Sequence, residues 1–255
     1  MGQVQSLTRG LTLLETLAGS PVALNLTDIS EKVGLPPSTV HRLLNTLLQQ
    51  QFVAQDGERA EWSVGVKAFS VGNAYLKSRD FITAARPFMR ELVAETGETS
   101  NLAILENGMP VFVAQIECDE MMRMVAKLGS HAPVHASGVG KAMLSVKPDN
   151  EIQALLGKPP YRQFTEKTYT TSEALLAELQ RVRQQGFAVD NEEQSPGLRC
   201  VAANIYNEYG EAVAAISISG PVQRVTEVRV QVLGGIVRTK ADAITHALGG
   251  TAPAS

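Results

Sequence analysis

The spacing of apolar residues predicts three helices at the start of the chain. Leucines recur at intervals of four, three and three residues from Leu7 to Leu17, which is the period of a helix over residues 4–18. A shorter apolar pattern predicts a second helix, capped by Thr27 and ended at Gly34. A third helix follows directly after this glycine. Its apolar stripe consists of Val40, Leu43, Leu44 and Leu47.

The polar side of this third helix suggests a role in reading DNA. The residues off the apolar stripe, on the exposed face of the first turns, are Ser38, Thr39, His41 and Arg42. Two short helices joined by a tight turn form a helix-turn-helix, in which the start of the second helix reaches base edges. Strand-like runs at 52–55 and 62–64 flank Asp56-Gly57 and predict a hairpin, which would be the wing.

The charge of this region leaves a second interpretation open. Residues 1–66 contain four basic and six acidic side chains, a net charge of −2. DNA-binding units are usually basic. The alternative to a winged helix-turn-helix is therefore a small helical cap with no role in DNA binding.

The rest of the chain mixes helices and strands. We expect a linker helix across 67–79, with Val66, Phe69 and Leu76 as a candidate dimer seam, and a further helix across 81–96. The later predicted helices cover 137–146, 172–185 and 225–244, and the predicted strands cover 101–105, 111–116, 122–126, 187–190, 201–206 and 212–219. Because these strands mostly pair through turns, we predict an α+β domain with a mainly antiparallel sheet over 80–250. Residues 251–255 should be a disordered tail.

Composition narrows the class of protein. Apolar residues make up 44% and charged residues 19% of the 255 residues, as in a globular protein that buries a core. No apolar run is long enough for a membrane helix, and the start lacks a signal-peptide pattern. Cys118 and Cys200 lie far apart without metal-type spacing, which favours a reducing compartment. We therefore predict a cytoplasmic protein without membrane association, metal or cofactor, in which any DNA contact is local because the net charge is −3.

The stretch Ser137-Gly138-Val139-Gly140-Lys141 is a candidate site for a small anion. Ser137 is suited to cap a helix, and the two glycines leave room for a ligand close to the backbone. A helix start also offers free N–H groups and the positive end of the helix dipole. The alternative is an ordinary turn, which a capped glycine pair forms more often.

Other polar residues follow downstream. In Ile216-Ser217-Ile218-Ser219 the alternation of a strand places both hydroxyls on one face. Gly197-Leu198-Arg199-Cys200 precedes a neighbouring strand, and Asp190 lies just upstream of it. Each of these features alone has an ordinary structural explanation.

An enzyme is a competing interpretation. Cys200 with Asp190 and a histidine would suggest a nucleophile, and His131 with His135 would suggest a metal pair. However, no histidine is near Cys200 in the sequence, and neither histidine has a clear third ligand. We therefore predict that the protein is not an enzyme.

The order of these segments resembles the IclR family of bacterial transcriptional regulators. Five motifs carry the resemblance: Leu35 to Leu44, Met122-Arg123-Met124, His135 to Ala142, Gly197 to Cys200, and Ala214 to Gly220. The resemblance implies a winged helix-turn-helix that binds double-stranded operator DNA over 1–66, a linker helix over 67–79 and a GAF- or profilin-like effector domain over 80–250. It also implies a homodimer, which in this family often pairs into a tetramer.

The resemblance further implies an effector pocket. Within the family the chain is most similar to the glyoxylate-responsive members, and Gln115–Cys118 and Val189–Glu193 favour those of allantoin utilisation. In these relatives the pocket is formed by positions that match Met124, Gly138, Val139, Asp190, Leu198, Cys200, Ser217 and Ser219. The implied protein is a regulator, by expectation a repressor, whose operator affinity depends on a small 2-oxo acid, with glyoxylate first and pyruvate second. A ligand-binding module that does not contact DNA is the remaining alternative.

Chemistry agrees with this pocket but raises two questions. The N–H groups of Gly138 and Val139 would hold a carboxylate, and the paired serines a second oxygen. Asp190 would repel an anion at close range unless the ligand also has a donor, such as the hydrated form of an aldehyde. The relatives carry alanine where this chain has Val139. If the Val139 side chain faces the ligand, the pocket is smaller than in those relatives. If only the Val139 N–H contacts the ligand, the pocket is unchanged.

Overall fold

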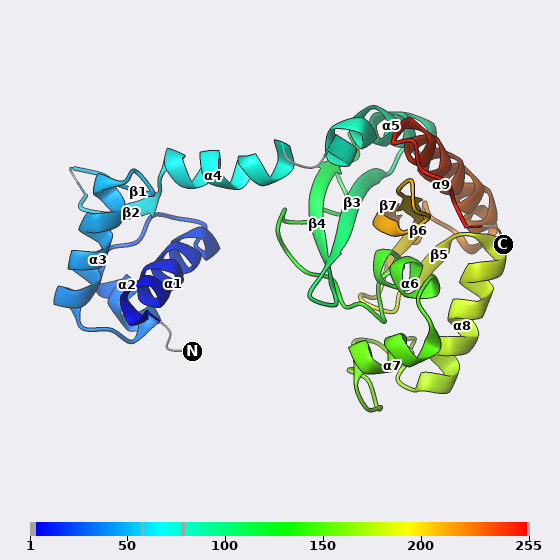
Figure 1. Ribbon diagram of the computed structural model, residues 1–255, viewed down its shortest axis with the longest axis horizontal. Helices are drawn as coiled ribbons and strands as arrows, with labels where there is room; N and C mark the ends of the chain where they lie inside the picture. The colour runs from blue at the N-terminus through cyan, green and yellow to red at the C-terminus, as the bar shows by residue number, and fades with distance from the viewer. Residues whose placement is uncertain (1–3, 58, 78–79, 254–255) are drawn as a thin grey trace. The chain divides into compact units, whose positions relative to one another are not determined.

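The N-terminal and C-terminal parts of the chain each form a hydrophobic core of their own. The computed structural model describes residues 4–57, 59–77 and 80–253, except for the side chains of 73–77 and 80 (Figure 1). Contacts within the chain divide it into two units, Met1–Ser78 and Arg79–Ser255.

The N-terminal unit is a winged helix-turn-helix, as predicted. It contains α1 (Gln5–Gly19), α2 (Leu26–Val33), α3 (Pro37–Gln49) and the antiparallel hairpin of β1 (Val53–Gln55) and β2 (Trp62–Val64). Its core consists mainly of Leu13, Leu17, Ile29, Val40, Leu44, Val53 and Trp62. This set includes the predicted stripe positions Val40 and Leu44, with Leu43 and Leu47 packed against it.

The predicted cap of α2 is wrong by two residues. Asn25 caps the helix, because its side chain accepts a hydrogen bond from the Asp28 N–H at 2.9 Å. Thr27 instead lies within the first turn. Asparagine is at least as good an N-cap as threonine, and Leu26 then becomes part of the helix.

The helix α4 (Val66–Lys77) carries apolar side chains on its surface. Val66 is 70% and Phe69 is 71% exposed. The side chain of Leu76, the third residue of the predicted seam, lies outside the described residues. The homodimer and the tetramer therefore stay predictions.

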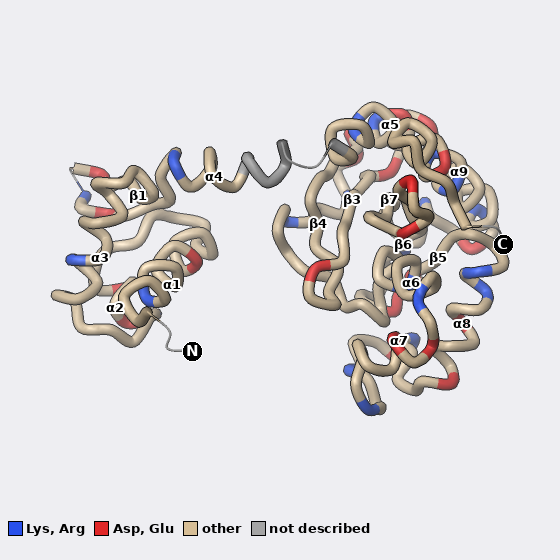
Figure 2. Tube along the Cα trace, viewed as in Figure 1, with Lys and Arg blue, Asp and Glu red and all other residues tan. Residues whose placement is uncertain are grey.

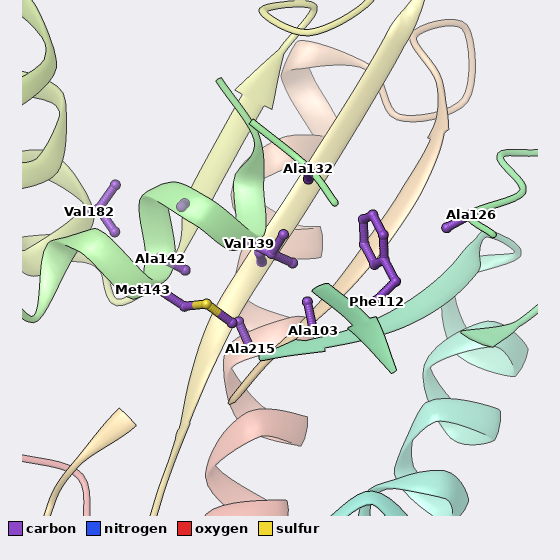
Figure 3. Packing of buried hydrophobic residues seen from close by; sticks show 11 residues of the cluster. Ala103, Phe112, Ala126, Ala132, Val139, Ala142, Met143, Val182 and Ala215 are labelled. Atoms are coloured by element: carbon purple, nitrogen blue, oxygen red, sulfur yellow. The ribbon is translucent and has the colours of Figure 1, made fainter. Parts of the chain in front are cut away.

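The C-terminal unit is built on an antiparallel sheet, which confirms the predicted α+β class. Within the described residues, five strands form the order β4-β3-β7-β6-β5, and each neighbouring pair is antiparallel. The strands are β3 (Thr99–Glu106), β4 (Met109–Ile116), β5 (Ala188–Asn191), β6 (Leu198–Tyr206) and β7 (Ala212–Pro221). The helices are α5 (Asp80–Thr96), α6 (Gly138–Ser145), α7 (Asp149–Leu156), α8 (Ser172–Gln185) and α9 (Glu227–Ala247). The short helix α6 lies on one face of the sheet with α8 beside it, and α9 lies on the other face (Figures 1 and 3).

Two local predictions in this unit need correction. Residues 122–126 are not a strand, because the free edge of β4 is already hydrogen-bonded to residues 129–131, through Phe112 and an isolated bridge between Val111 and His131. The helix α7 was not predicted at all. Ile152 is its only buried residue among those described, so its apolar pattern is too short to recognise.

The predicted tail is partly anchored. The Thr251 N–H donates to the Asn207 carbonyl at 3.2 Å, and residues 254–255 lie outside the described residues.

No helix in the described part of the chain is both long and apolar enough to span a membrane.

Candidate effector site and DNA-reading helix

The start of α3 presents polar side chains to solvent. The helix follows α2 after a turn that begins at Gly34, which has left-handed backbone angles (φ 65°). Because Val40 and Leu44 face the core, Ser38, His41 and Arg42 are exposed and Thr39 is half-buried. Among the described residues, no carboxylate lies within ion-pair distance of Arg42. Charges of both signs are scattered over this unit (Figure 2), so any attraction to DNA is local.

The start of α6 lies very close to the sheet. Ser137 caps the helix as predicted, accepting from the Gly140 N–H at 3.1 Å and donating to the Pro133 carbonyl at 2.7 Å. A Cβ on Gly140 would stand 2.2 Å from the Val134 carbonyl oxygen, and one on Gly138 would stand 2.9 Å from Cys200 Sγ. Only glycine fits at position 140, where the clash is with backbone, and a side chain at position 138 would require the Cys200 thiol to shift. The first-turn N–H groups of Gly138 and Val139 have no acceptor within the helix.

The strands bring the other predicted polar residues under this helix start. Asp190 pairs with Cys200 in the β5–β6 register, and Cys200 pairs with Ser219 in the β6–β7 register. Ser217 lies two residues along β7, and Leu198 two residues along β6, so both share the same face of the sheet. Asp190, Cys200, Ser217 and Ser219 are all buried, and Leu198 is half-buried.

The two remaining predicted residues belong to the apolar side of this region. Val139 is 1% exposed and packs in a cluster with Ala103, Phe112 and Ala132 (Figure 3). Met124 is half-buried against the same cluster. The extra methyl groups of Val139 relative to alanine therefore have a place in the core, which favours the interpretation that only its N–H is used.

A chain of hydrogen-bonded polar side chains beside the serines was not predicted from the sequence. Gln115 donates to Asn101 Oδ1 at 2.7 Å, and Asn101 donates to Ser219 Oγ at 3.5 Å. In the described part of the chain, the buried Ser217 Oγ has no hydrogen-bond partner. The available signal was the polar start of β3, Thr99-Ser100-Asn101, on a strand that is otherwise apolar and central.

A buried charge cluster lies next to the site. Lys141, on α6, is fully buried and forms ion pairs with Glu193 and, at 3.5 Å, with Glu178. Its Nζ also lies 5.0 Å from the centre of the Tyr169 ring. The sequence alone does not reveal a role for Lys141, because its partners are more than thirty residues away.

Burial changes the acidity of two site residues. Burial, together with the charge of Glu193, raises the pKa of Asp190 to about 7, although Asp190 Oδ1 accepts backbone hydrogen bonds from Glu193 and Gln194. Burial raises the pKa of Cys200 to about 11, against a smaller opposite effect of the Ser219 and Ser217 hydroxyls. Cys200 is thus a protonated thiol near neutral pH and a poor nucleophile.

Comparison with known proteins identifies the family. Residues 6–57 match the IclR helix-turn-helix domain, and residues 73–246 match the bacterial transcriptional regulator IclR C-terminal domain. The chain belongs to the IclR family. Its members are transcriptional regulators, so the chain is a regulator and not an enzyme.

The similarity to named relatives covers almost the full length of this IclR-family chain. The acetate operon repressor of Salmonella typhimurium is 44% identical over 98% of this chain and 92% of its own length. The HTH-type transcriptional repressor AllR of Escherichia coli is 43% identical over 96% of this chain and 90% of its own length. The crystal structure of Thermotoga maritima IclR matches with a TM-score of 0.84 and 26% identity, over 97% of this chain and 100% of that one. The first two identities are nearly equal, so the resemblance to the allantoin type in particular stays a prediction.

The buried ion pairs of Lys141 give a first testable prediction. Replacing Lys141 with methionine leaves Glu193 and Glu178 buried without this cation, so we expect a loss of about 3–5 kcal/mol of unfolding free energy, measured in urea. Adding Glu193→Gln to the same chain should restore much of the loss.

Lys147→Met is the matched control for this experiment. Lys147 forms a surface pair with Glu151 at 3.6 Å, so its loss should cost under about 1 kcal/mol. Equal effects of the two lysine substitutions would show that Lys141 is not held by a buried ion pair.

Proposed function

We propose that this IclR-family chain is a repressor that binds operator DNA through the start of α3, and that a small 2-oxo acid controls its operator affinity. Glyoxylate is the first candidate effector and pyruvate the second. Family membership and the repressor names of its relatives support the DNA-binding part. A regulator that meets DNA in a bacterial cell would act in the cytoplasm.

The observation that carries the effector proposal is a buried hydroxyl without a partner, Ser217, on the part of the sheet that the start of α6 covers. The N–H groups of Gly138 and Val139 can hold a carboxylate at the positive end of α6. The Cys200 thiol lies against the Gly138 backbone and close to the hydroxyls of Ser217 and Ser219. Apart from the nearby Cys200 thiol, the Ser217 hydroxyl has no hydrogen-bond partner among the described residues, so an oxo or hydroxyl oxygen of the ligand would satisfy it.

Charge and size favour a small, singly charged ligand. Lys141 is the nearby buried cation, and its charge is already compensated by Glu193 and Glu178. A second negative charge on the ligand would therefore have only neutral N–H and O–H donors. Leu198 and Met124 can supply apolar walls, and the burial of the polar residues leaves little room for a long ligand.

Asp190 fits this proposal in its neutral form. A carboxyl with a pKa of about 7 is half protonated at neutral pH and can donate a hydrogen bond to an anion instead of repelling it. No donor on the ligand is then required. Because the site is buried, a ligand must enter by a movement of the surrounding segments, and it shifts operator affinity only as far as it prefers one conformation.

The DNA-binding part predicts a selective loss in one variant. Arg42→Ala should weaken binding to a labelled operator duplex by about 1–3 kcal/mol if Arg42 contacts a base. The effector affinity should stay unchanged. Lys158→Ala, which removes an exposed charge from the C-terminal unit, is the control for net charge. Equal affinities of the two variants would remove Arg42 from the interface.

The effector part predicts the loss of one calorimetric signal. The parent should release or absorb heat on titration with glyoxylate, and the double variant Ser217→Ala/Ser219→Ala should not, since both ligand-facing hydroxyls are gone. Operator affinity without ligand should stay close to that of the parent. Binding of glyoxylate by the double variant, or no binding by the parent, would show that the site or the ligand is wrong.

The acidity of Asp190 predicts that glyoxylate binding depends on pH. A bound carboxylate favours protonated Asp190, so binding takes up a proton, and affinity should fall by up to about tenfold per pH unit above pH 7. The other titratable groups close to Asp190 are Glu193, Lys141 and Cys200.

Asp190→Asn tests the origin of this dependence. The amide is neutral at every pH and can still accept the backbone hydrogen bonds, so the variant should bind glyoxylate with a nearly flat pH profile. A flat profile for the parent, measured by titration calorimetry from about pH 6 to about pH 9, would contradict the role of Asp190.

A further inference from the structure

A hollow of about 350 Å³ lies at the other end of α6, away from the effector site. The strand β5 begins at Ala188, opposite Ala202, so β6 beyond that pair has no described strand on this side. The ends of α6 and α8, the middle of α9 and residues 252–253 surround the space instead. The hollow thus occupies the place of a missing strand.

Asn204 supplies the first sign that the hollow binds something. It lines the space from β6 and is 8% exposed. Its Nδ2 donates to the Ala142 carbonyl at 2.6 Å, which fixes the orientation of the amide. Its Oδ1 is buried and accepts no hydrogen bond of normal length in the described part of the chain. The Tyr206 side chain lies close to this amide: burial raises the pKa of Tyr206, and the contact with Asn204 partly offsets the rise. A buried acceptor without a partner lowers stability, so a ligand with an N–H group would be stabilised here.

A cation and an anion with unused hydrogen-bonding capacity line the same hollow. Arg238 and Asp242, one turn apart on α9, are separated by 3.9 Å and are each about half exposed. Apart from this weak pair, Arg238 has one long hydrogen bond, 3.3 Å to the Gln185 carbonyl, among its described contacts. Arg183, the other arginine of the hollow, is already bonded to the carbonyls of Ser145 and Lys147 and to Asp149.

The rest of the lining is apolar apart from Tyr206 and Ser145, and the Ser145 hydroxyl already donates to the Ala142 carbonyl at 2.6 Å. Val146, Val182, Phe187 and Pro253 provide carbon surface, and the Tyr206 side chain adds a hydroxyl that can donate. The space therefore offers an acceptor pair, a donor pair and an apolar wall.

We propose that this hollow is a second ligand site, which binds a free α-amino acid with a small aliphatic side chain. The ammonium group would donate to Asn204 Oδ1 and to Asp242. The carboxylate would accept from Arg238 and the Tyr206 hydroxyl, and the side chain would contact Val182 and Phe187. A zwitterion can pair with both Arg238 and Asp242, whereas a simple acid or a simple amine leaves one of these two side chains without a partner. This site is separate from the effector site and goes beyond the proposed function.

Calorimetry on the full chain tests the proposal. The probes are glycine, L-alanine, L-valine and L-leucine, in a buffer free of amino acids, with 3-methylbutanoate and 2-methylpropan-1-amine as analogues of valine that lack one charged group. We expect at least one amino acid to bind, and each analogue to bind at least about tenfold more weakly than valine. No binding by any of the amino acids at millimolar concentration would overturn the proposal, as would equal binding of valine and its analogues.

Variants locate the binding. Arg238→Met should weaken amino-acid binding at least about tenfold, and Arg229→Met, on the exposed side of the same helix and outside the hollow, should not. Asn204→Leu should act like Arg238→Met. If Asn204→Leu does not fold, Arg238→Met still tests the site, because Arg238 is half exposed and its replacement does not disturb the core.

The effector-site variant separates the two ligands. Ser217→Ala/Ser219→Ala should bind the amino acid as the parent does. Loss of amino-acid binding in that variant, or equal binding by Arg238→Met and Arg229→Met, would overturn the proposal whether or not glyoxylate binds elsewhere.

Discussion

The C-terminal unit depends on how closely the start of α6 lies against β6. Gly138 lies against the Cys200 thiol of β6, and Gly140 lies against the backbone carbonyl of Val134, in the segment just before the helix. Small residues on the sheet, such as Ala202 and Ala215, allow this close packing. A side chain at Gly138 would meet the Cys200 thiol and Ala202 on the sheet, and one at Gly140 would meet the backbone of Val134, so either would disturb the start of α6.

A helix packed this closely on the sheet buries polar groups away from water, and this burial determines the charge states of the groups around it. Lys141 is buried because it lies on α6, and it is paired there with Glu193, just after β5, and with Glu178 of α8. Asp190 is near enough to Glu193 to feel its charge, and burial favours its neutral form. The same packing therefore produces both a cation already occupied by protein carboxylates and a carboxyl that need not repel an anion.

Patterns local in sequence were predictable, and contacts between distant segments were not. The leucine period of α1 and the stripe of α3 gave the helix-turn-helix, because burial of one helix face repeats every turn. The Ser137 cap was recognisable because its hydrogen bond reaches only three residues along the chain, to the Gly140 N–H. By contrast, residues 122–126 were assigned to a strand because nothing nearby in sequence reveals that residues 129–131 occupy the edge of β4. The row of Asp190, Cys200 and Ser219 depends on strand register, which the family resemblance suggested and the spacing alone could not give. Lys141, Asn101 and Asn204 were missed because their partners are set by tertiary packing.

The shape of α6 connects the two ends of the unit. Its first turn faces the candidate effector site, and its last residues, together with the carbonyl of Ala142, face the hollow beside Asn204. If this eight-residue helix shifts as a unit, its two ends move together. A ligand that shifts one end must then change the free energy of binding at the other by the same amount in both directions. Such coupling requires no path of contacts through the core, only a helix whose position both ligands prefer differently.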